Sequence, residues 1–153
     1  MLLASYELGP AGYSRSQGVA FDRELLSKIE ALPGVESATL ADFSPLSFAI
    51  HSDIVEPDGY VSQPRESMEI SRALVGPNYF RAIRTALSAG RDFSSQDSET
   101  SQPVTIVNQA FAERYWPGRD AIGKRINTRG RWLTVIGVAR NAKYRRLAYL
   151  RSR

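Results

Sequence analysis

Residues 104–118 read Val-Thr-Ile-Val-Asn-Gln-Ala-Phe-Ala-Glu-Arg-Tyr-Trp-Pro-Gly, and they predict a strand, a helix and a stop in one short run. The β-branched residues Val104–Val107 are typical of a compact strand. Asn108 favours an N-cap, because its side chain can accept a bond from the free N–H groups of a helix start. The helix is predicted over Gln109–Tyr115 and ends before Pro117-Gly118. Its inward face is predicted to carry Phe111, Ala112 and Tyr115.

Downstream, residues Ala121–Ile126 lead into a predicted hairpin around Thr128-Arg129-Gly130. The return strand is predicted over Trp132–Val138. Residues from Arg140 onward carry no stop signal or cap. The C-terminal part of the chain is therefore expected to be a strand, a helix and a hairpin in sequence.

Upstream, apolar residues at spacings of four, four and three predict an amphipathic helix, ended by Pro33-Gly34, with Phe21, Leu25, Ile29 and Leu32 on one face. Residues 1–16 are expected to be irregular. A second helix is predicted from Pro77, with the apolar stripe Tyr79, Phe80, Ile83 and Leu87. Strands are predicted over Val35–Ala41 and Glu66–Val75, with a hairpin around Ala49–Val55. Arg72 interrupts the otherwise apolar face of the second of these strands.

This order of elements predicts an α+β fold: two small βαβ-like lobes, with helices packed on a mixed, mainly antiparallel sheet. One domain is expected over residues 13–147, incomplete at its C-terminus, followed by a basic tail over 148–153. The 153 residues are enough for a real apolar core, and no cysteine is present, which excludes disulfides and thiolate metal sites. The N-terminal residues are not expected to be a signal peptide, since they lack a basic segment and a long apolar segment, and no apolar run approaches the ~20 residues that span a bilayer.

Charge is unevenly distributed along the chain. Residues 1–113 hold 8 basic and 15 acidic side chains, whereas residues 114–153 hold 12 basic and 1 acidic. A basic C-terminal third is compatible with nucleic-acid binding, but a solvated basic face is the interpretation we favour, because no recognition helix is predicted there.

The sequence shows no pattern of catalytic or metal-binding residues, and we expect no catalytic, cofactor-binding or metal site. His51 is the only histidine, so a serine hydrolase would have to use it as its base. Asp92, Asp97 and Glu99 share one loop but lack the spacing of an EF-hand, and a solvated polar loop is favoured. Phosphate-binding glycine motifs are absent.

The string Tyr115-Trp116-Pro117-Gly118 is the most distinctive. Its aromatic rings lie close in sequence to Arg114, Arg119 and Lys124, so they could stack on bases. The favoured interpretation is that they pack on the core at the helix end, with Trp132 joining the same cluster.

Six strings in this order resemble the MacB-like periplasmic core domain of FtsX-like ABC-transporter permeases. They occupy residues 32–38, 75–81, 89–93, 107–118, 122–126 and 135–144. The resemblance covers roughly residues 13–147. It implies a non-catalytic domain on the periplasmic side of the inner membrane, which works with the membrane-spanning and ATPase parts of a transporter.

The resemblance also implies coupling to periplasmic adaptors or exported substrates, with no nucleic acid and no cofactor. The chain departs from the family in lacking membrane helices and an ATPase domain, and in the basic end from Tyr144 to Arg153. A fragment of a permease is therefore the first hypothesis. A small nucleic-acid-binding protein is the second, and a hydrolase using His51 is the third.

Overall fold

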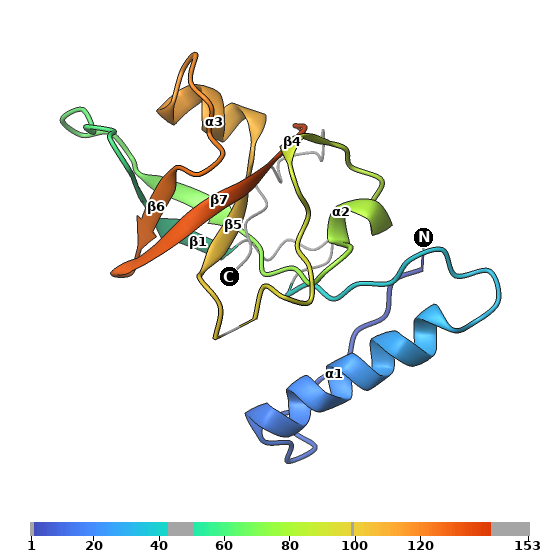
Figure 1. Cartoon of the computed structure of the whole chain (residues 1–153). Coiled ribbons are helices and arrows are strands. Elements are labelled where there is room, and N and C mark those ends of the chain that lie inside the picture. Colours follow the sequence, from blue (N-terminus) through green and yellow to red (C-terminus); the bar gives the residue numbers. More distant parts are fainter. Residues whose placement is uncertain (1, 43–50, 99, 142–153) are drawn as a thin grey trace.

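A computed structural model describes residues 2–42, 51–98 and 100–141 of the chain. Strands from the middle and C-terminal parts form one body, and helix α1 (Arg15–Glu30) lies beside it, as Figure 1 shows. The predicted α+β class, with few helices on mainly antiparallel strands, is confirmed. The predicted basic tail over 148–153 lies outside the described residues.

Strand β7 (Arg131–Ala139) organises the larger sheet, because three other strands pair with it directly. It pairs antiparallel with β6 (Arg125–Thr128) and β4 (Leu87–Gly90), and parallel with β5 (Val104–Asn108). The short strand β2 (Glu56–Pro57) then pairs with β6. The predicted hairpin and its return strand are therefore confirmed, and in the part of the chain that the structure describes the sheet has five strands.

Helix α3 (Gln109–Tyr115) packs on this sheet and begins and ends where the sequence predicts. The Asn108 side chain accepts a hydrogen bond from the Phe111 amide at 2.9 Å, which confirms the predicted N-cap. Below the helix lies an apolar cluster of buried residues that includes Val107, Phe111, Tyr115, Trp116, Ile126 and Val135. Burial of this cluster fixes the helix to the sheet.

A second, two-stranded sheet is formed by β1 (His51–Ile54) and β3 (Glu69–Arg72), which pair antiparallel. The chain passes from β1 to β2 through Val55, which is fully buried. Ile70 of β3 belongs to the same apolar cluster as α3, so the smaller sheet packs against the larger one. Part of the hairpin predicted around Ala49–Val55 lies outside the described residues.

The predicted first helix is confirmed, but its limits differ slightly from the prediction. It begins at Arg15, inside the segment 1–16 that was expected to be irregular, because Ser14 and Gln17 form a capping box in which each side chain bonds the other's backbone. It ends at Glu30, a few residues before Pro33-Gly34. The segment predicted as a strand over Val35–Ala41 forms no ladder. It is held instead by an isolated bridge from Ala41 to Val75.

The predicted second helix is shorter than expected, and the strand that follows it was missed. Helix α2 spans only Tyr79–Ala82. Arg84 adopts a left-handed conformation with φ of 55°, and the Thr85 amide bonds the Phe80 carbonyl at 2.9 Å. This is the hydrogen-bond pattern of a Schellman motif, which ends helices. Leu87, predicted to lie on the helix, therefore begins β4.

Within the described residues, α1 is the longest helix, and none of the helices has the length and apolar character needed to cross a bilayer.

Candidate functional site

His51 and the acidic loop are the two sequence features considered for chemistry. His51 is at the start of β1, with its Nε2 atom 4.0 Å from Asp42 Oδ2. The hydroxyl of the adjacent Ser52 donates a hydrogen bond to Glu69. Among residues 2–42, 51–98 and 100–141, no three His, Cys, Asp or Glu side chains gather in a metal-binding arrangement.

The acidic loop after β4 is held by an ion pair. Arg91 donates to both carboxylate oxygens of Asp97 at 2.7 Å, and the Ser94 amide donates to the same carboxylate at 2.8 Å. The hydrogen bonds from Arg91 lower the pKa of Asp97 to about 2. Burial raises the pKa of Asp92, whose carboxylate accepts the Phe93 amide. Glu99 lies outside the described residues.

The Arg91–Asp97 pair predicts an acid-dependent contribution to stability. Asp97 stabilises the fold only when it is ionised, and its folded pKa lies below its ordinary value of 3.8. The contribution is therefore complete above about pH 4 and is lost as the pH falls through about 2. We expect the difference in unfolding free energy between the wild type and Asp97→Asn to shrink in this window, as measured by urea denaturation.

The exposed Glu113→Gln variant is the control for that experiment, because it removes an acid that lies at the surface of α3. A difference between wild type and Asp97→Asn that stays constant from about pH 5 to about pH 2 would contradict the assignment.

The aromatic string at the end of α3 packs in the core, as the favoured interpretation predicted. Tyr115 and Trp116 are each 3% exposed. The Phe111 ring lies 4.5 Å from Tyr115 and 5.7 Å from Trp116, measured between ring centroids. The indole N–H of Trp116 donates to the Asp58 carbonyl at 2.9 Å. These two rings are therefore not exposed for stacking on bases.

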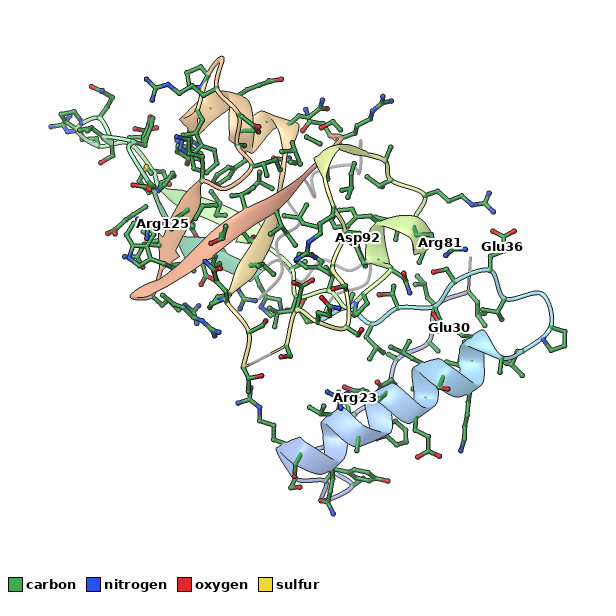
Figure 2. The ribbon with its side chains drawn as sticks, in the orientation of Figure 1. Arg23, Glu30, Glu36, Arg81, Asp92 and Arg125 are labelled. Atoms are coloured by element: carbon green, nitrogen blue, oxygen red, sulfur yellow. The ribbon has the colours of Figure 1, made fainter. Side chains whose placement is uncertain are left out.

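Trp132, which was predicted to join that cluster, lies elsewhere. It is 43% exposed and stacks with the Arg125 guanidinium, whose carbon lies 4.9 Å from the ring centroid. Strand alternation explains the difference, because Trp132 precedes the buried Leu133 and so points to the opposite face of β7. Figure 2 shows Arg125 on the β6–β7 hairpin, at the far side of the molecule from Arg23 and Glu30 on α1.

Polar contacts tie the segment that leads into β3 to α3. Arg114 donates to Glu66 at 2.8 Å and to the Ser67 carbonyl at 3.0 Å. The Tyr60 hydroxyl lies 2.8 and 2.9 Å from the two oxygens of Glu66. The hydrogen bond from Arg114 is the main cause that lowers the pKa of Glu66 to about 2, and the bond to Glu66 raises the pKa of Tyr60.

The sequence did not predict the chain of ion pairs between the two sheets. Asp53 of β1 is buried, with a side chain 2% exposed, and its Oδ2 lies 2.8 Å from Nε of Arg72. Its Oδ1 lies 2.5 Å from Nη2 of Arg129, in the β6–β7 turn. Arg72 also lies 3.6 Å from Asp42. The one sequence signal was Arg72, a cation on the apolar face of a predicted strand.

An open groove of about 910 Å³ lies beside this ion-pair chain. It is lined by residues of β1 and β2, the start of β3 and the β6–β7 turn. Asp53 and Arg129 are both part of its wall, and their contact joins β1 to the β6–β7 turn there.

Three solved structures share the fold of this chain. The periplasmic region of MacB from Actinobacillus actinomycetemcomitans has a TM-score of 0.59 at 16% identity, covering 86% of this chain and 53% of that one. The extracellular domain of the ABC-type transporter YknZ from Gram-positive bacteria has a TM-score of 0.55 at 18% identity, covering 86% and 62%. A putative permease domain from Porphyromonas gingivalis has a TM-score of 0.51 at 19% identity, covering 78% and 46%.

At these identities the solved structures show a shared fold. The chain spans about half to three fifths of their length. A search of curated proteins gave no match. The family model described as the MacB-like periplasmic core domain matches residues 5–150, nearly the whole sequence, and the chain therefore belongs to the MacB-like periplasmic core domain family.

Proposed function

We propose that this chain is the extracytoplasmic, non-catalytic domain of an ABC-transporter permease, with its domain over residues 13–147. In this role it couples ATP-driven movement of the membrane part to an exported substrate or a periplasmic partner. The observation that carries the proposal is the family match over residues 5–150. The two sheets support it, because they share one packed core and are joined by ion pairs, as a domain that transmits movement requires.

A chimera tests this function. In a MacB-type permease, the segment that corresponds to residues 5–150 is replaced by this chain, and transport is measured in cells. We expect transport above that of a control whose ATPase carries an inactivating substitution. A chimera that folds and hydrolyses ATP but transports no more than the control would contradict the proposal.

The side of the membrane can be tested in the same chimera. This chain has no cysteine, so Val61→Cys adds a single thiol at a site that is 82% exposed. In a chimera free of other cysteines, we expect a membrane-impermeant maleimide to label this thiol in intact spheroplasts. Labelling only after lysis would place the domain in the cytoplasm and contradict the proposal.

A further inference from the structure

The two arginines that contact Asp53 differ in their exposure to solvent. The Arg72 side chain is 12% exposed and lies on β3, next to β1. The Arg129 side chain is 62% exposed and comes from the β6–β7 turn of the other sheet. Asp53 therefore has one inner cation and one outer cation, and solvent reaches only the outer one freely.

Release of Arg129 leaves Asp53 paired. A buried carboxylate without a cation is strongly disfavoured. If Arg129 moves away, Asp53 keeps the Arg72 contact at 2.8 Å, so departure of the outer cation does not leave an isolated buried charge. Breaking the Arg129 contact costs less free energy than breaking the Arg72 contact, because the Arg129 guanidinium is already largely hydrated.

The β6–β7 turn has a backbone conformation that is unfavourable for an arginine. Arg129 has a φ of 52° and Gly130 a φ of 77°, both in the left-handed region. Non-glycine residues other than Asn and Asp avoid this region. The arginine therefore occupies a position where its backbone is disfavoured, and its side chain makes an ion pair with Asp53 at the wall of the groove. Neither the contact of Asp53 Oδ1 with Arg129 nor that of Arg72 Nε with Asp53 is an aligned hydrogen bond, so both contacts are ion pairs, and they differ in exposure to solvent.

We propose that Arg129 is a releasable latch: it closes the β6–β7 turn over the groove by binding Asp53, and it opens the groove by leaving Asp53 paired with Arg72 alone. The closed arrangement is the one in the structure. The latch goes beyond the proposed function. Its test uses the chain alone, so a chimera that fails to transport would contradict the proposed function without contradicting the latch.

Hydrogen exchange followed by mass spectrometry tests the latch. Arg129→Asn removes the cation and places in the turn a residue that tolerates the left-handed backbone. We expect exchange to rise about fivefold in peptides that cover residues 51–56 and 125–133, as loss of one partly exposed ion pair predicts. Peptides from β5 are expected to keep their exchange rates, and the melting temperature is expected to stay near that of the wild type.

Two matched variants complete the experiment. Arg129→Lys retains the charge and is expected to exchange within about twofold of the wild type. Arg131→Gln removes an exposed cation from the same hairpin and is expected to change nothing. Unchanged exchange in Arg129→Asn would overturn the proposal. A rise throughout the five-stranded sheet with a lower melting temperature would also overturn it, because Arg129 would then be an ordinary structural residue.

The salt dependence of hydrogen exchange in the wild type is a second test, and it requires no variant. Raising NaCl from about 0.05 M to about 1 M screens solvent-exposed ion pairs. We expect exchange of residues 51–56 and 125–133 to rise with salt in the wild type. Exchange in these peptides that is independent of salt would overturn the latch.

Discussion

Replacing Gly90 by alanine is expected to destabilise the fold by about 4 kcal/mol, from about 1–2 kcal/mol of left-handed backbone strain and about 2–3 kcal/mol of overpacking. Gly90 has a φ of 73° and lies opposite Gly137 in the β4–β7 pairing. A Cβ atom at Gly90 would overlap the Ile136 carbonyl oxygen and lie 2.7 Å from Ile122 Cδ1 and 2.8 Å from Gly137 Cα. Two of these contacts are with backbone, which cannot move aside without breaking the ladder. Urea denaturation measures the effect.

Gly59→Ala is the matched control for this prediction. Gly59 has nearly the same backbone angle, a φ of 74°, but no atom lies within 4 Å of the position that a Cβ would take. We expect it to show the backbone strain alone, about 1–2 kcal/mol. Equal losses of unfolding free energy in the two variants would contradict the prediction, because the close approach of β4 and β7 would then not contribute to the effect at Gly90.

Replacing Arg72 by methionine is expected to cost about 3 kcal/mol, because the buried Asp53 loses its buried partner and keeps only the solvent-exposed Arg129. Arg72 contacts Asp53, whose side chain is 2% exposed, and it also contacts Asp42. Methionine fills a similar volume, so the loss reports charge rather than a cavity. Arg129 alone does not replace Arg72, since the Arg129 side chain is 62% exposed and solvent screens its charge.

A double-mutant cycle separates this charge effect from packing. Asp53→Asn combined with Arg72→Met removes the stranded carboxylate, and we expect the double variant to lose at least about 1 kcal/mol less than the sum of the single variants. Arg131→Met, at an exposed arginine, is expected to change stability by less than about 0.5 kcal/mol. Strict additivity of the Asp53 and Arg72 substitutions would contradict the proposed pairing.

The sequence predicts the C-terminal half of the fold best, because its signals there are local. The N-cap Asn108 and the stop after Tyr115 bound helix α3 correctly, and the turn around Gly130 marks the hairpin. Helix α2 was predicted too long because its end depends on Arg84, a residue type that rarely adopts the left-handed conformation that ends a helix. The start of α1 was readable from Ser14 and Gln17, but their capping box was missed.

The ion-pair chain could not be predicted, because its members come from separate parts of the chain. Asp53 and Arg129 are brought together only when β2 pairs with β6, and no local pattern encodes that pairing. Arg72 is a cation on an apolar strand face, which indicates that it pairs with a buried acid, but the pattern does not identify that acid. The resemblance to the permease family came from short strings and predicted the family correctly, but such strings do not identify long-range contacts.

The place of β7 in the chain also determines when the larger sheet can form during synthesis. Strands β4, β5 and β6 all pair with β7, and β7 ends at Ala139, after every one of its partners. The ribosome therefore synthesises β4, β5 and β6 before β7, the strand with which all three pair. Until β7 emerges, β4 and β5 have no ladder partner among the described strands, so the nascent chain depends on late, non-local pairing to complete its sheet.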